Sequence, residues 1–195
     1  MKVKKIEKIK ELNYLHSYRI HYKTKNDKDG IWELVSRGDK SRLEDELHDN
    51  KSYTDGTMVF ATSKDKRLVV VLKEYRVSAG RYVYMLPAGL IDPNEDVKTA
   101  AIREFKEETG MTFYPEYVEK ERYTSVGIIN EKVNIVYGTY SGQPSKAFQE
   151  EHEDAEIFLI DKNEANRILE EEEVSIRTAM LLQQFYQLHP YFNET

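Results

Sequence analysis

Residues 89–111 read GLIDPNEDVKTAAIREFKEETGM and place apolar and acidic side chains at helical spacing. At about 100° per residue, one side of a helix collects four apolar residues: Val97, Ala101, Ile102 and Phe105. Asp96 suits the N-cap, with Asp92 as the alternative, because an aspartate side chain accepts hydrogen bonds from the first free amides. Gly110, after Thr109, suits the C-terminal stop because glycine adopts positive φ at low cost. The stretch therefore predicts one amphipathic helix.

Three glutamates form a second stripe beside the apolar one. Glu104 and Glu108 are four residues apart, and Glu107 follows Glu104 by three. Like charges at these spacings destabilise a helix by about 0.2–0.5 kcal/mol per pair. Mg²⁺ or Mn²⁺ reverses this cost, since such cations prefer oxygen ligands and often bridge carboxylates to substrate phosphates. The pattern predicts a divalent metal site. The alternative is a solvated acidic helix face, which is the ordinary explanation of a Glu-Glu pair taken alone.

Flanking residues support this interpretation. Arg103 is placed to turn back toward Glu95 or a neighbouring carboxylate and hold it in place. Gly89, after Pro87 and Ala88, allows a tight turn beside the helix, so that the backbone carbonyl of Ala88 can face the metal. The metal site is therefore expected to combine side-chain carboxylates with one backbone oxygen.

The whole chain limits the classes of protein to consider. Its 195 residues carry a net charge of -6 and include no cysteine. A general nucleic-acid binder needs clustered Lys and Arg, so this class is excluded. Disulfides and thiolate metal sites are excluded as well, which fits a cytoplasmic protein. No apolar run reaches 18 residues and the basic N-terminus lacks an apolar signal region, so we expect neither a membrane span nor secretion.

The N-terminal part predicts a small sheet. Residues 1–15 have weak helix spacing and read as a helix or a frayed arm. Residues 17–37 alternate around the Asn26–Gly30 turn and predict a hairpin. Residues 38–56 are polar, and three alternatives stay open for them: a linker, a short helix around 43–47, or a mobile loop.

The remaining chain alternates between strands and helices. Helices are expected at 161–171, with Asp161 as N-cap, and at 174–188. Residues 124–131 and 141–153 read as loops. Strands are expected at 57–61, 67–75, 82–86, 117–123, 132–140 and 156–160. This order predicts an α+β fold, an α/β/α sandwich rather than regular βαβ units.

The stretch at 89–111 resembles the Nudix box, Gly-x5-Glu-x7-Arg-Glu-U-x-Glu-Glu-x-Gly-U, where U is apolar. Every position is filled, and Phe105 is larger than the usual aliphatic residue. The resemblance implies a Nudix α/β/α sandwich at 56–195, preceded by a small antiparallel sheet at 1–55 for dimerisation. It implies metal-dependent hydrolysis of a nucleoside diphosphate linked to another group. It makes Glu104 and Glu108 the chief metal ligands, Glu107 a further ligand or a residue that supports the ligands, and Arg103 with Glu95 the orienting pair.

Flanking segments are similar to the ADP-ribose pyrophosphatase branch of that family. These are WELVSR at 32–37, EYR at 74–76 and LPAGLID at 86–92, within a similarity that runs from about residue 18 to 188. The branch implies a homodimer whose protomers share the substrate pocket. The resemblance further implies that Trp32 stacks on the base and that Arg76 reaches the diphosphate. Further substrate contacts are implied at Glu33, Arg37 and Glu131.

A late loop completes the implied site. The segment at 148–154 matches the loop that supplies the base or a further metal ligand, with Glu151 first and Glu153 second. His152 is the next candidate, and a solvated acidic loop is the plain alternative. The expected products from ADP-ribose are AMP and ribose 5-phosphate.

The chain differs from the branch at one residue, so the resemblance does not determine the substrate. ADP-ribose pyrophosphatases usually carry a proline before the glycine of the 124–131 loop, whereas this chain has Val126. Another sugar nucleotide, such as GDP-mannose, is the first alternative substrate. A non-catalytic Nudix-like nucleotide sensor is the second alternative, and a purely structural acidic helix is the third.

Overall fold

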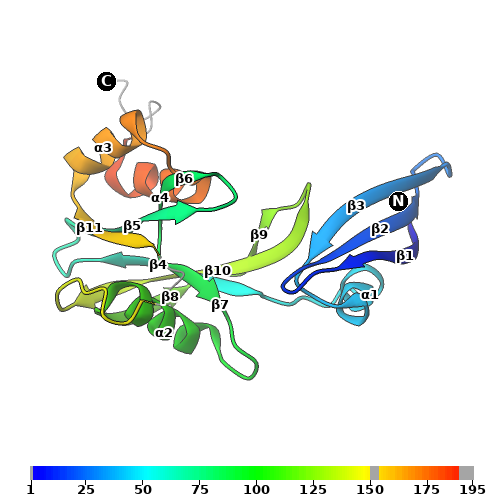
Figure 1. Cartoon of the computed structure of the whole chain (residues 1–195), viewed down its shortest axis with the longest axis horizontal. Coiled ribbons are helices and arrows are strands. Elements are labelled where there is room, and N and C mark those ends of the chain that lie inside the picture. Colours follow the sequence, from blue (N-terminus) through cyan, green and yellow to red (C-terminus); the bar gives the residue numbers. More distant parts are fainter. Residues whose placement is uncertain (1, 150–153, 189–195) are drawn as a thin grey trace. The chain divides into compact units, whose positions relative to one another are not determined.

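The computed structural model describes residues 2–149 and 154–188. The chain divides into two compact units (Figure 1). The first contains Met1–Asp55 together with Lys120–Asn134, and the second contains Gly56–Glu119 and Ile135–Thr195. The N-terminal region expected at 1–55 is thus accompanied in its unit by residues 120–134.

The first unit is a mixed sheet with one helix. Ile6, Tyr18, Ile20 and Leu43 form its buried core. Asp39 caps the helix by accepting a hydrogen bond from the Arg42 amide at 2.9 Å. Its elements are β1 (Lys2–Glu11), β2 (His16–Lys23), β3 (Asp29–Ser36), α1 (Lys40–His48), β9 (Arg122–Ser125) and the first part of β10 (Ile129–Ser141).

The N-terminal segment corrects one expectation. Residues 1–15 were expected as a helix or a frayed arm, but they contain the strand β1, which pairs with β2 along its length. Register shifts at Val3/Lys5 and Lys8/Lys10 interrupt the strand's two-residue alternation. The alternation of apolar and polar residues that signals a strand is therefore missing from the sequence.

Two other expectations for this unit are confirmed. The hairpin at 17–37 forms β2 and β3, joined by a tight turn. The short helix was one of three alternatives for residues 38–56, and α1 shows that it is the correct one.

The second unit is a sheet between helices. Its strand order is β10, β4, β5 and β11, with β8 on β10, β7 on β4 and β6 on β5. Its elements are β4 (Gly56–Thr62), β5 (Val69–Arg76), β6 (Arg81–Met85), β7 (Ala88–Leu90), α2 (Val97–Thr109), β8 (Thr112–Val118), the rest of β10, β11 (Ala155–Ile160), α3 (Lys162–Glu171) and α4 (Ile176–Tyr186).

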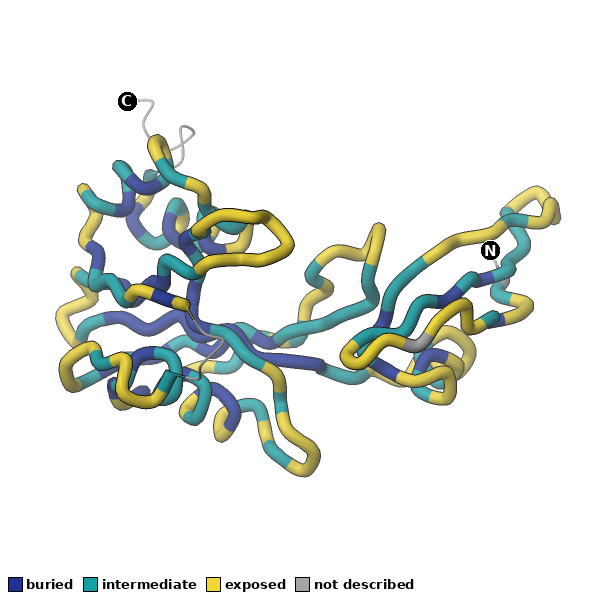
Figure 2. The backbone as a smooth tube through the Cα atoms, viewed as in Figure 1, coloured by how far each residue is buried: buried dark blue, intermediate teal, exposed yellow. Residues whose placement is uncertain are grey.

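Strand β4 shows how the layers pack, because all of its residues are buried (Figure 2). Val59 and Ala61 join the core under α2, which includes Phe105. Alternate residues join the core under α3 and α4: Met58 and Phe60 pack in the cluster that contains Leu182. Helix α2 thus covers one face of the sheet, and α3 with α4 covers the other. This confirms the predicted α+β sandwich.

The strand expected at 117–123 is wrong. Residues 112–118 form β8 and residues 122–125 form β9, on opposite sides of the boundary between the units. Strand β8 starts directly after the helix because Phe113 packs on Phe105, with ring centroids 5.3 Å apart. The expected loop at 124–131 is shorter, since the turn closes with a 3.0 Å bond from the Ile128 amide to the Ser125 carbonyl.

Candidate active site

The helix α2 begins and ends at the residues that the sequence indicates. The Asp96 side chain accepts bonds from the amides of Lys98 and Thr99, at 2.9 and 3.2 Å. Gly110 ends the helix in the left-handed region with φ 71°. The fully buried Phe105 anchors the helix to the sheet. The acidic stripe is therefore fixed in rotation about the helix axis.

Arg103 is the centre of the acidic cluster. Its Nε and Nη2 donate to the two Glu95 oxygens at 3.0 and 2.8 Å. Its Nη1 donates to Glu104 at 2.8 Å and to Glu107 at 3.1 Å. Its Nη2 also reaches the Leu90 carbonyl at 3.0 Å. One guanidinium thus connects three carboxylates to the turn that precedes the helix.

These contacts shift the ionisation of the cluster. The hydrogen bonds from Arg103 lower the pKa of Glu95 below its ordinary value, against the opposing effect of burial. The Glu95 bonds raise the pKa of Arg103. Both groups therefore stay charged over the physiological range of pH.

The short strand β7 brings backbone to the other two glutamates. The Ala88 amide donates to Glu108 Oε2 at 3.0 Å. A Cβ atom built on Gly89 would lie 1.9 Å from Glu104 Cδ and 2.1 and 2.2 Å from its carboxylate oxygens. Glu104 therefore occupies the space that any other residue at position 89 would fill. Glycine is needed at this position because of a close approach and not because of a turn.

The first unit contains the expected base-stacking residue. Trp32 is 49% exposed and faces a hollow of about 300 Å³. Val126, the departure in the sequence, lines the same hollow. The other lining residues are Ile20, Leu34, Leu47, Tyr123, Ile129 and Asn130.

The other expected substrate contacts of this unit are paired within the protein. Arg37 Nε donates to Glu131 Oε1 at 2.6 Å, and the Thr124 hydroxyl donates to the other Glu131 oxygen at 2.9 Å. Glu33 accepts from Arg19 across the hairpin at 3.0 Å. Glu33 follows Trp32 on the strand, so the two side chains point to opposite faces of the sheet. The structure brings Arg37 and Glu131 together and separates Glu33 from Trp32.

Arg76 and the late loop belong to the second unit. Arg76 lies at the end of β5, half exposed, and donates to Glu74 at 2.7 Å. Glu151, Glu153 and His152 lie outside the described residues, so their expected roles stay predictions. The chain just before them is fixed, because Gln149 Nε2 donates to the Glu108 carbonyl at 2.8 Å.

Comparisons with known proteins agree with this geometry. The NUDIX domain family model matches residues 52–186. The chain belongs to the Nudix family. The resemblance in residues 89–111 is thereby confirmed. None of the helices in the described part of this Nudix protein is long and apolar enough to span a membrane.

Individual relatives place the chain near enzymes of the ADP-ribose branch. It is 34% identical over 99 residues to the putative nudix hydrolase 2 of Caenorhabditis elegans, covering 50% of this chain and 41% of that protein. It is 27% identical over 130 residues to the ADP-ribose pyrophosphatase of Bacillus subtilis, covering 66% and 70%. The corresponding yeast enzyme, from Saccharomyces cerevisiae, is 29% identical over 109 residues, covering 54% and 43%. The chain thus spans less than half of the worm and yeast proteins.

A solved structure shows the same fold over nearly the whole chain. An ADP compounds hydrolase aligns with a TM-score of 0.72, covering 96% of this chain and 95% of that one. Its sequence identity is 19%, so the likeness concerns the fold. The Nudix sandwich and its small additional sheet are therefore a shared architecture.

The Nudix helix offers a donor set that suits Mg²⁺. Carboxylate and backbone oxygens are the ligands this cation prefers. Glu104 and Glu108 lie beside the Ala88–Gly89 backbone, and Glu107 lies on the same helix. Within residues 2–149 and 154–188, no three acidic or histidine side chains converge in the arrangement of a metal site. The Arg103 guanidinium lies between Glu104 and Glu107. The donors fit a divalent cation, which Glu104, Glu107 and Glu108 would hold.

The Glu95–Arg103 pair predicts a pH-dependent contribution to stability. Because the pKa of Glu95 is lowered in the folded state, its contribution is fully present above the ordinary value of 4.5. The contribution is lost as the pH falls through the lowered pKa. We expect wild type to exceed Glu95→Gln in free energy of unfolding at pH 7, and the difference to shrink toward pH 3. Urea unfolding across that range measures it.

An exposed glutamate provides the control for this titration. Glu156 lies on β11, and Glu156→Gln is expected to follow the wild-type curve. A difference between wild type and Glu95→Gln that stays constant from pH 7 to pH 3 would contradict the assignment.

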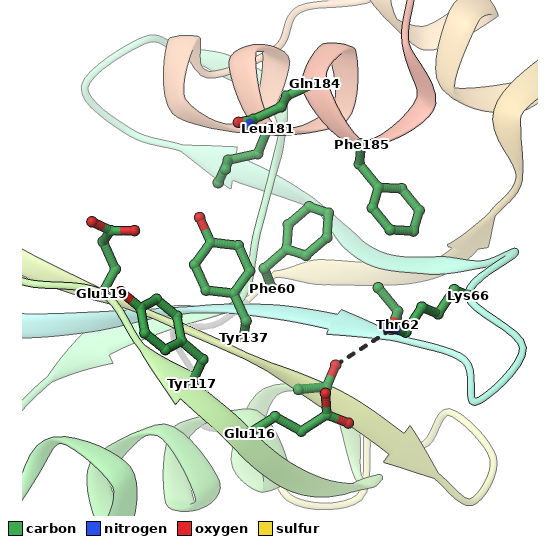
Figure 3. A pocket seen from close by; sticks show the side chains of 11 residues that line it. Phe60, Thr62, Lys66, Glu116, Tyr117, Glu119, Tyr137, Leu181, Gln184 and Phe185 are labelled. Atoms are coloured by element: carbon green, nitrogen blue, oxygen red, sulfur yellow. Dashed lines mark hydrogen bonds between the residues drawn. The ribbon is translucent and has the colours of Figure 1, made fainter.

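A second hollow, of about 400 Å³, lies on the opposite face of the sheet from the Nudix helix (Figure 3). Phe60 and Tyr137 form its floor, and Phe185 of α4 closes it from above, 5.3 Å from the Phe60 ring. Its rim carries Lys66 as well as glutamates, so its charge selects no single class of ligand. It is separated from the acidic cluster by the sheet.

Proposed function

We propose that this protein hydrolyses the diphosphate of ADP-ribose or a closely related nucleoside diphosphate sugar, with Mg²⁺ or Mn²⁺ as cofactor. The observation that carries the proposal is the seating of Glu104 against Gly89 with Glu108 on the Ala88 amide. This brings two carboxylates to the backbone of one short strand, β7. The ADP-ribose pyrophosphatases among the relatives support the substrate class.

The proposed metal ligands are Glu104, Glu107, Glu108 and the Ala88 carbonyl. When bound, the metal would neutralise charge on the diphosphate oxygens and would make the attacking water more acidic. Arg103 donates to Glu95 and to the Leu90 carbonyl, and these bonds hold the helix against the segment that precedes it.

The remaining steps fall to side chains around the diphosphate. A water oxygen attacks one phosphorus, the bond from that phosphorus to the bridging oxygen breaks, and AMP and ribose 5-phosphate leave. Glu151 takes the proton of the attacking water in this proposal, with Glu153 as the alternative. Arg76 exchanges Glu74 for a diphosphate oxygen, since a guanidinium matches that geometry. Arg37 and Glu131 act as a preformed pair that contacts the rest of the substrate.

Trp32 provides a test of base recognition. We expect Trp32→Ala to raise KM for ADP-ribose about 10-fold with little change in kcat, because base stacking on an aromatic ring contributes about 1–3 kcal/mol. Trp32→Phe keeps an aromatic face and should stay near wild type. Steady-state kinetics on the three proteins measures the effect. An unchanged KM in Trp32→Ala would remove the stacking role.

A homodimer is part of the proposal. The first unit exposes large apolar side chains outside the Trp32 hollow that a partner protomer would cover, among them Ile31 and Ile128. Light scattering after gel filtration should give twice the chain mass of 23.0 kDa. A mass equal to one chain would refute the dimer.

A substrate panel tests the function itself. ADP-ribose, GDP-mannose, NADH and diadenosine polyphosphates are incubated with the protein and Mg²⁺, and the products are identified by mass spectrometry. We expect ADP-ribose to give AMP and ribose 5-phosphate. Cleavage of GDP-mannose alone would refute ADP-ribose as the substrate and would still support diphosphate hydrolysis. No cleavage of any compound would favour a nucleotide sensor.

A further inference from the structure

Thr57 carries a buried hydroxyl next to the acidic cluster. The residue is 1% exposed, at the start of β4. Its Oγ1 has no hydrogen-bond partner within the described residues. A buried hydroxyl without a partner destabilises a fold, and valine would fill the same space without that cost. A threonine at this position therefore points to a partner that arrives with a ligand.

The strand pairing shows where this hydroxyl lies. Thr57 is the direct antiparallel partner of Gly89. Directly opposed residues in an antiparallel pair place their side chains on the same face, with Cβ atoms about 5 Å apart. The Cβ position of Gly89 is itself within 2.2 Å of both Glu104 oxygens. The Thr57 side chain is thus the cross-strand neighbour of the Glu104 carboxylate.

The burial pattern along β4 independently shows on which face of the sheet the Thr57 side chain lies. Val59 and Ala61 have the same parity as Thr57, and both pack in the core beneath α2 with Phe105. Residues of the other parity, such as Met58, pack under α4. Thr57 therefore points to the α2 side of the sheet, where the acidic stripe lies.

We propose that Thr57 is a positioning residue for the metal site: its hydroxyl donates a hydrogen bond to the Glu104 carboxylate when Glu104 binds the cation. This rests on the proposed metal role of Glu104. In the present structure Glu104 Oε1 accepts from Arg103 at 2.8 Å. When the carboxylate turns from Arg103 to the cation, the Thr57 hydroxyl satisfies one of its oxygens. Hydrogen bonds of this kind orient a ligand and increase metal affinity.

The test separates this role from simple packing by measuring two properties. Thr57→Val keeps the volume and removes the donor, whereas Thr57→Ser keeps the donor. Mn²⁺ binding is measured directly by the loss of the free-ion signal in electron paramagnetic resonance. We expect Thr57→Val to raise the Kd for Mn²⁺ about 10–100-fold, and Thr57→Ser to stay within a few-fold of wild type.

Thermal unfolding of the same proteins supplies the second property. Without metal, Thr57→Val should melt at or above the wild-type temperature, because it removes a hydroxyl without a partner. With saturating Mn²⁺ on wild type, the variant should gain fewer degrees than wild type does. A packing role predicts equal gains in both proteins, and equal gains would overturn the proposal.

Thr62 is the matched control on the same strand. It is 7% exposed, and its hydroxyl donates to the Gly138 carbonyl at 3.5 Å, away from the acidic cluster. Thr62→Val should lower the melting temperature and leave the Kd for Mn²⁺ unchanged. If wild type binds no Mn²⁺, the proposed metal site itself fails. If wild type binds and Thr57→Val binds with the same Kd, the Thr57 role alone fails.

Discussion

Replacing Glu108 by glutamine is expected to lower kcat for the hydrolysed sugar nucleotide about 10³-fold, or about 4 kcal/mol of transition-state stabilisation. Glutamine keeps the shape and can still accept the Ala88 amide, which donates to Glu108 at 3.0 Å. It lacks the negative charge that a divalent cation requires. The fold should therefore survive while the metal site is lost.

Two measurements check this expectation. Steady-state kinetics with Mg²⁺ gives kcat, and circular dichroism with a thermal melt confirms the fold. Glu156→Gln, an exposed glutamate on β11, is the matched control and should keep wild-type kcat. Near-normal turnover by Glu108→Gln would overturn the assignment of this residue to the metal.

Adding one methyl group at Gly89 is expected to have the second largest effect. The Cβ of Gly89→Ala would lie 1.9 Å from Glu104 Cδ, so the carboxylate has to move away. A displacement of this size at a reacting centre costs about 100-fold in kcat/KM. The atom displaced is the end of a flexible side chain. We therefore expect the free energy of unfolding to change by less than about 1 kcal/mol.

A comparable clash in the other compact unit serves as control. The Cβ of Gly30→Ala would lie 2.6 Å from the Tyr22 ring, also the end of a side chain. Gly30 lies in the N-terminal hairpin, and its variant should keep wild-type kcat/KM and Mn²⁺ affinity. If Gly89→Ala shows wild-type Mn²⁺ affinity and kcat/KM, Glu104 is not held by this glycine.

Local sequence determined the Nudix helix almost completely. The apolar spacing, the Asp96 cap and Gly110 act within a few residues, so α2 forms between the residues they indicate. The Glu95–Arg103 pair was predicted for the same reason, and the structure confirms it at 2.8–3.0 Å. Signals of this range do not depend on the rest of the chain.

Expectations failed where structure depends on distant partners. Strand β1 exists because residues 2–11 pair with β2, and two register shifts mask its alternation. The strand expected at 117–123 was wrong because the boundary between the compact units crosses it. Gln149 was missed for a similar reason, since its bond to the Glu108 carbonyl joins residues 41 positions apart.

The sequence by itself determined the family, the acidic stripe and the caps of the helix that carries it, since all of these follow from spacing along one helix. The tertiary structure alone decided what surrounds the stripe. Gly89 makes room for Glu104 and the Ala88 amide meets Glu108, because a separate strand lies against the helix. Thr57 belongs to this second group: it is 32 residues from Gly89 in the chain, and only the pairing of β4 with β7 places the two residues directly opposite each other.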